Sequence, residues 1–186
     1  MLHRSVRRVV TSIAIVALGV AALGACTPGS QGQSPNSGSD VKVAAKGNAA
    51  VQKIDLSKPI ASQDVTVPGA DGDKVTVGVL SLQVQGKLAI LNLVLTPKFT
   101  SVSAKDDISI YDMLGSHGLY PTLIDRDNLK VYSGVSSFKT DESTKTVNGK
   151  PIYAWVAFAA PEDDQTAFDV RINDNWPMFT NVPVSK

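Results

Sequence analysis

The chain has one cysteine and two histidines among its 186 residues, and both scarcities restrict its chemistry. A single cysteine cannot form a disulfide within the chain, so stability has to come from a packed core. A zinc site needs three or four His, Cys or carboxylate ligands, which this set does not convincingly supply. Aromatic residues make up 6% of the chain, too few to line the cleft of a glycoside hydrolase. We therefore expect no metal and no cofactor.

No charge of one sign dominates, because 18 basic residues face 17 acidic ones. Three of the basic residues, Arg4, Arg7 and Arg8, lie in the first 25 positions, which hold no acidic residue. Removal of residues 1–25 would therefore change the formal charge from +1 to −2. A nucleic-acid partner is not expected, because no basic stripe would remain.

The one long apolar run, residues 13–23, is shorter than the roughly 20 residues that a membrane span requires. It follows the three arginines and leads into Leu23-Gly24-Ala25-Cys26, after which the chain turns abruptly polar. A basic start and an apolar stretch are typical of an export signal. An ordinary cut after Ala25 would place bulky Leu23 where a small residue is preferred.

The order of Leu23, two small residues and Cys26 resembles the lipobox of bacterial lipoproteins. The resemblance implies that Cys26 receives a diacylglyceryl group and becomes the new N-terminus. The protein would then be anchored by acyl chains at the extracytoplasmic face of the cell membrane. The alternative is an ordinary signal that leaves behind a buried thiol.

Composition divides the rest of the chain into a tether and a domain. Residues 26–50 contain the cysteine and a stretch of small and polar residues, which predicts a flexible tether. Residues 51–186 are long enough for one domain with its own core. We thus predict a signal peptide at 1–25, a tether at 26–50 and a domain at 51–186.

The domain consists of short apolar runs separated by Gly, Pro, Asn and Asp at intervals of about ten residues, which is typical of a β-sandwich or barrel. Residues 75–84 and 88–95 are predicted to form a hairpin around Gln85-Gly86-Lys87. No amphipathic helix of twelve or more residues is expected. Further strands are predicted at 64–67, 108–113, 119–124, 129–133, 152–159, 167–172 and 179–184.

Alternation along residues 152–158 places Tyr153 and Trp155 on one strand face, opposite an apolar face that begins at Ile152. In the next strand, Asp169 and Arg171 are predicted to share the outer face and to pair. Near the C-terminus, Trp176, Met178 and Phe179 are residue types enriched at interfaces. The sequence leaves two interpretations of the five aromatic and Met residues open, a possible interaction patch or core packing. They are Tyr153, Trp155, Trp176, Met178 and Phe179.

No catalytic constellation is evident, and we predict that the protein is not an enzyme. His117 lies between glycines in a predicted turn, and its neighbour Ser116 does not provide the geometry of a nucleophile and its base. Several acidic turns could offer oxygen ligands to calcium, but Asp and Asn are also favoured in turns for local bonding. These turns contain Asp71 and Asp73, Asp125 and Asp127, Glu162 to Asp164, and Asn173 to Asn175.

Parts of the domain resemble exported, often lipid-anchored, actinobacterial proteins with an immunoglobulin-like antiparallel β-sandwich. The resemblance implies a binding or accessory protein of the cell envelope without enzymatic activity, such as an accessory subunit of a membrane protein complex, with a protein partner in the envelope. A carrier of lipid or another apolar ligand at the cell surface is the alternative, since barrels rich in Val, Leu and Ile hold such ligands. The resembling pieces are residues 75–95, Ile110-Tyr111-Asp112, Gly118-Leu119-Tyr120-Pro121, residues 153–161 and residues 176–184.

Overall fold

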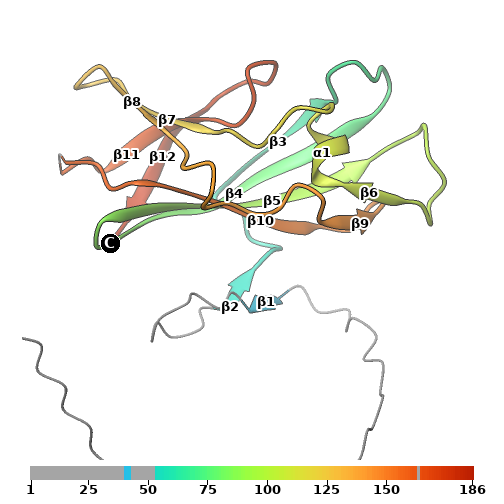
Figure 1. Cartoon of the computed structure of the whole chain (residues 1–186), viewed down its shortest axis with the longest axis horizontal. Coiled ribbons are helices and arrows are strands. Elements are labelled where there is room, and N and C mark those ends of the chain that lie inside the picture. The colour runs from blue at the N-terminus through green and yellow to red at the C-terminus, as the bar shows by residue number, and fades with distance from the viewer. Residues whose placement is uncertain (1–39, 43–52, 163) are drawn as a thin grey trace, which may run out of the picture. The chain divides into compact units, whose positions relative to one another are not determined.

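The computed structural model describes residues 40–42, 53–162 and 164–186 (Figure 1). The predicted signal peptide, Cys26 and most of the predicted tether lie outside these described residues. Twelve strands and one short helix form the described part of the chain. They are β1 (Asp40–Lys42), β2 (Lys53–Asp55), β3 (Ala61–Thr66), β4 (Lys74–Gln85), β5 (Leu88–Lys98), β6 (Asp107–Ser109), α1 (Ile110–Met113), β7 (Thr122–Asp125), β8 (Lys130–Ser133), β9 (Lys145–Val147), β10 (Ile152–Ala159), β11 (Ala167–Arg171) and β12 (Phe179–Ser185).

Eight of the strands form one mixed sheet in the order β10-β5-β4-β12-β11-β7-β8, with β3 also paired to β4. Strand β4 pairs with β5 along one edge and divides its other edge between two partners. The first half of that edge pairs with β3, while Leu82 and Gln83 pair with β12. A β-bulge between Val79 and Ser81 separates the two halves and adds local bend and twist, so the sheet curls (Figure 1).

The segment after β8 lies along β10. These two strands are at opposite ends of the strand order in the sheet. The Val135 amide donates to the Ala157 carbonyl at 2.8 Å, and the Ala157 amide donates to the Phe138 carbonyl at 2.9 Å. The Thr140 amide continues the pattern with a 2.9 Å bond to the Trp155 carbonyl. Residues 135–140 therefore cover the backbone edge that β10 would otherwise present.

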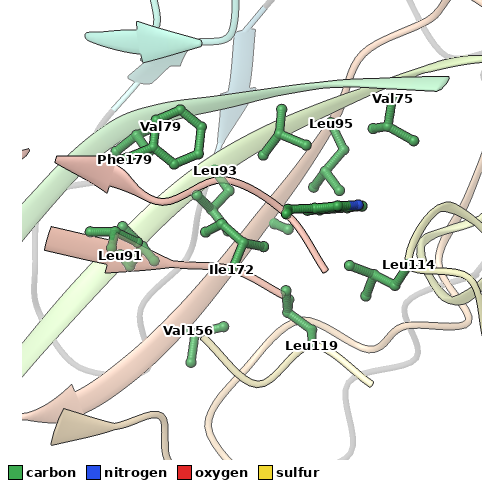
Figure 2. Close-up of a cluster of buried hydrophobic side chains, with 14 of the residues drawn as sticks. Val75, Val79, Leu91, Leu93, Leu95, Leu114, Leu119, Val156, Ile172 and Phe179 are labelled. Atoms are coloured by element: carbon green, nitrogen blue, oxygen red, sulfur yellow. The ribbon is translucent and has the colours of Figure 1, made fainter. Parts of the chain in front are cut away.

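Inward side chains of β4, β5 and β10 build the main core. Val156 stands opposite Leu91, and Val79 stands opposite Leu93, so the apolar positions of the three strands face the same side. Figure 2 shows Leu91, Leu93 and Leu95 together with side chains from the opposing segments. Full burial of each such side chain stabilises the fold by about 1.5–3 kcal/mol. The predicted face alternation of residues 152–158 is confirmed by this register.

The prediction of a strand over 108–113 is only half right. Strand β6 ends at Ser109, and residues 110–113 form α1. The Ser109 hydroxyl accepts from the Asp112 amide, while the Asp112 carboxylate accepts from the Ser109 amide. This reciprocal capping box stabilises a helical turn and ends the strand.

The all-β class is confirmed, because α1 is the single helix among the described residues. The expectation of a purely antiparallel sheet is wrong at one place, since β12 runs parallel to β4. Strand β1 falls inside the predicted tether, where it pairs with β2. Strands β2 and β9 were not predicted, as each is only three residues long.

Candidate functional site

Tyr153 and Trp155 lie on the outer face of β10, but Tyr153 is held in a polar chain across three strands. Its hydroxyl donates to Asn92 Oδ1 at 2.6 Å, and Asn92 Nδ2 donates to Ser81 Oγ at 2.8 Å. Tyr153 also packs against a second apolar cluster built on Leu56, Leu80 and Val94. Burial raises the pKa of Tyr153. The residue is therefore tied into the fold, and Trp155 beside it is half-buried.

The three C-terminal candidates are split between core and surface. Trp176 and Phe179 are buried in the main core, and Trp176 Nε1 donates to the Thr66 carbonyl at 2.9 Å. Met178 between them is 40% exposed. The structure thus does not bring Trp176, Met178 and Phe179 together as one exposed patch, because the two aromatic side chains point into the core.

His117 is exposed at the turn that follows α1. Its Nδ1 lies 2.8 Å from the Gly115 carbonyl oxygen, so one ring nitrogen is engaged by the local backbone. Ser116 next to it adopts a left-handed conformation with φ of 62°. This places His117 at the surface and leaves Ser116 as a turn residue.

Three of the acidic turns use side-chain oxygens for hydrogen bonds within the protein. The Asp125 carboxylate accepts from the amides of Asp127 and Asn128, and the Asn173 side chain accepts from the Asn175 amide. The Asp73 carboxylate is buried and accepts bonds from the loop that follows β5. Within 53–162 and 164–186, no three His, Cys, Asp or Glu side chains gather closely enough to hold a metal ion.

A hollow of about 330 Å³ lies between two segments that the sequence did not link. One wall comes from His117, Gly118, Tyr120 and Thr122, and the other from residues 171–175. Strands β7 and β11 bring these walls together, since Thr122 stands opposite Arg171 in the antiparallel pair. Most of the residues around the hollow carry polar side chains, and they include His117, for which the sequence analysis predicted no catalytic role.

The Tyr120 ring at the rim rests on a buried charge. The Lys139 ammonium lies 3.9 Å from the ring centroid, and this lysine side chain is only 10% exposed. The ammonium also pairs with Glu142, whose carboxylate accepts from the Leu119 amide at 2.9 Å. Burial acts to raise the pKa of Glu142, but the Lys139 ammonium and the Leu119 amide outweigh it and lower that pKa. The ring is therefore fixed on its inner side.

Sequence reasoning missed Tyr120 as a site residue. Tyr120 is 63% exposed, and Gly118 leaves it room, because a Cβ at Gly118 would overlap the ring. The available signal was the block Gly118-Leu119-Tyr120-Pro121, in which an aromatic residue stands between a glycine and a proline. Tyr111 and Phe138 are exposed as well.

Comparison of the sequence with protein-family models, curated proteins and solved structures gives no match. No helix within the described ranges is both long and apolar enough to cross a membrane.

Proposed function

We propose that the chain is a lipid-anchored protein of the cell envelope that acts as a binding or accessory module and not as an enzyme. The observation that carries the proposal is the order of basic start, apolar run and Leu23-Gly24-Ala25 ahead of the single cysteine, Cys26. A diacylglyceryl group on Cys26 would hold the protein at the extracytoplasmic face, since two acyl chains give stable attachment. As part of the same proposal, the chain is related to the actinobacterial lipoproteins that its sequence resembles.

The surroundings of His117 support a role without catalysis. Nucleophilic catalysis needs a nucleophile within hydrogen-bond reach of its base, whereas the contact of the exposed His117 ring among the described residues is with the Gly115 carbonyl. In two of the acidic turns, Asp125 and Asn173 accept bonds from nearby backbone amides, which accounts for these residue types. These features favour recognition over chemistry.

A protein partner in the envelope is supported by the exposed aromatic side chains. Tyr111, Tyr120 and Phe138 project from segments that meet at residues 139–142, where the Tyr111 amide donates to the Glu142 carbonyl at 3.0 Å. Aromatic residues are enriched in the centres of interfaces. The carrier alternative lacks comparable support, because inward side chains of β4, β5 and β10 occupy the space where a barrel would hold its ligand.

We also propose that the curled sheet is a variant of the immunoglobulin-like sandwich. Its strands fall into two groups, β3-β4-β5-β10 and β12-β11-β7-β8, joined where β4 divides its edge. A sandwich of this kind packs the inner faces of two such groups around one core.

The test is affinity purification of the full chain from gently solubilised membranes of its source, followed by mass spectrometry. We expect a membrane protein at near-equal amount with the wild type, and its loss with Cys26→Ser. Pro28→Ala, which leaves Leu23 to Cys26 intact, is the control and should retain the partner. An unchanged partner set with Cys26→Ser would contradict the role of the anchor, and the absence of any partner would contradict the subunit role.

A further inference from the structure

We propose that the hollow beside Tyr120 is a binding site for a neutral saccharide. This inference rests on the proposed function and deepens it, because it names the chemical class that the binding module would recognise. The observation behind it is that the exposed Tyr120 ring lies beside several side chains that donate and accept hydrogen bonds.

The orientation of Tyr120 follows from what lies under it. Lys139 is almost fully buried and sits 3.9 Å from the ring centroid, so it covers the inner face of the ring. The 63% exposure of Tyr120 therefore belongs mainly to its outer face and edge. Gly118 also lies against the ring, because a Cβ there would overlap it. A fixed aromatic face is a platform for the C–H face of a sugar ring.

The opposite wall, residues 171–175, provides hydrogen-bond donors and acceptors that are near one another in the chain. Arg171 Nη1 donates to Asp174 Oδ1 at 3.2 Å, and Asn175 Nδ2 donates to Asn173 Oδ1 at 3.3 Å. Guanidinium, carboxylate and amide groups all retain further hydrogen-bonding capacity after one such contact. Vicinal hydroxyls of a sugar both donate and accept, and they match a mixed wall of this kind.

Charge and size narrow the ligand class. The positive charge of Arg171 is paired with the negative charge of Asp174, so the wall has no net charge to select an ion. An apolar ligand would cut off from water the hydrogen-bonding capacity that Arg171 and Asn173 retain beyond these contacts, which is unfavourable. A volume of about 330 Å³ lies at the small end of ligand sites and fits about one or two sugar rings.

The experiment is saturation-transfer NMR on the full chain, in a detergent without a sugar headgroup, with cellotriose, maltotriose, mannotriose, chitotriose, arabinotriose and their monosaccharides. We expect at least one of these sugars to bind, and Tyr120→Ala to weaken that binding about tenfold or more. Tyr120→Phe keeps the aromatic face and should retain binding. Tyr111→Ala removes another exposed tyrosine outside the hollow and should also retain it.

Because Tyr120→Ala also removes a contact with a buried lysine, Arg171→Gln supplies a second test. The Arg171–Asp174 pair is solvent-exposed, so this change should weaken sugar binding while the melting temperature stays close to that of the wild type. Tighter binding of a trisaccharide than of its monosaccharide would support a polymer as the source. Equal affinities would support a free sugar.

The proposal is overturned if no sugar of the panel binds with a Kd below about 10 mM, or if Tyr120→Ala and Tyr111→Ala weaken binding equally. The Cys26→Ser variant distinguishes failure of the sugar site from failure of the lipid anchor, because it lacks the sulfur that would be lipidated and keeps the hollow. If Cys26→Ser still binds the sugar but the wild type carries no lipid, the anchor has failed and the site stands. If lipidation holds and no sugar binds, the site has failed and the anchor stands.

Discussion

The hydroxyl of Tyr153 donates a 2.6 Å hydrogen bond to the side-chain oxygen of Asn92, which is itself almost completely buried. This bond joins β10 to β5, and the Asn92 amide continues the chain to Ser81 on β4. Asn92 is the one polar residue in an otherwise apolar central stretch of β5, residues 88–95. Its presence there is explained by the partners that satisfy both ends of its amide.

Tyr153→Phe should destabilise the domain by about 1–3 kcal/mol, because it leaves Asn92 Oδ1 buried without its donor. Chemical denaturation at pH 8 measures the change. Phe138→Leu, at an exposed aromatic position, should alter the stability by less than about 0.5 kcal/mol. Equal effects of the two changes would mean that the bond to Asn92 contributes nothing.

The same tyrosine predicts a loss of stability in alkali. Burial raises the pKa of Tyr153 in the folded state above its ordinary value near 10. Its contribution is therefore fully present below pH 10 and is lost as the pH rises above that value, since only the unfolded chain ionises there. The free energy of unfolding should fall less steeply between pH 9 and 11 in Tyr153→Phe than in the wild type. Parallel curves would contradict this role.

Trp176 should be the most sensitive of the candidate interface residues. Trp176→Ala is expected to cost about 3–5 kcal/mol because it opens a cavity in the main core. Trp176→Phe keeps most of the volume but loses the bond to the Thr66 carbonyl, and should cost about 1–3 kcal/mol. Met178→Ala is the neighbouring exposed control, with an expected change below about 0.5 kcal/mol. A large effect at Met178 and a small one at Trp176 would reverse our assignment of core and surface.

Two glycines with similar backbone angles separate conformational strain from steric overlap. Gly86 and Gly115 have φ of 61° and 66°, but only at Gly115 would a Cβ overlap another group, the carbonyl of Pro68. Gly86→Ala should cost about 1 kcal/mol for its left-handed conformation alone. Gly115→Ala should cost a further 1–3 kcal/mol or so from overpacking. Thermal unfolding of the two variants measures the difference, and equal melting temperatures would exclude the overlap.

Asp73 should make the fold sensitive to acid. Burial acts to raise the pKa of its carboxylate, but bonds from Ser101 and Thr100 outweigh burial and lower it. Stability from these bonds is present above the unfolded pKa near 3.9 and is lost as the pH falls through the lower, folded pKa. Asp73→Asn should be about 1.5–3 kcal/mol less stable at pH 7, with a flatter dependence below pH 4. Denaturation series at pH 7 and at pH 3 test this, and an unchanged acid dependence would refute it.

Much of the strand pattern could be predicted because it depends on local sequence. The hairpin of β4 and β5 follows from two apolar runs around Gly86, which adopts the positive φ that the turn requires. The alternation in β10 correctly separated the core-facing residues from Tyr153 and Trp155. Periodicity and turn chemistry are properties of neighbouring residues, and they need no knowledge of the tertiary fold.

The prediction that Asp169 and Arg171 pair with each other is wrong, and the reason is tertiary. Asp169 is covered on its own face of the strand, where its carboxylate accepts from the Asn181 amide and pairs with Arg126. Arg171 instead pairs with Asp174. The bulge opposite Asp169 has its extra residue in β12, where Asn181 adopts a φ of 56°, and the partners that this arrangement gives Asp169 come from other segments of the chain.

The hollow beside Tyr120 also could not be predicted from the sequence. Its two walls are about fifty residues apart along the chain and meet only through the pairing of β7 with β11. The cation under the ring, Lys139, comes from a third segment. Local patterns predict elements, whereas a site built from three segments depends on how those elements pair.

The most direct test of the central claim is mass spectrometry of the N-terminal peptide of the protein purified from its own membranes. The account predicts a mature chain that begins at Cys26 and carries a diacylglyceryl group on its sulfur. Leu23→Asp should abolish both the cleavage and the added mass, while Pro28→Ala should preserve them. A mature chain with unmodified Cys26, or one that begins at another residue, would contradict the account.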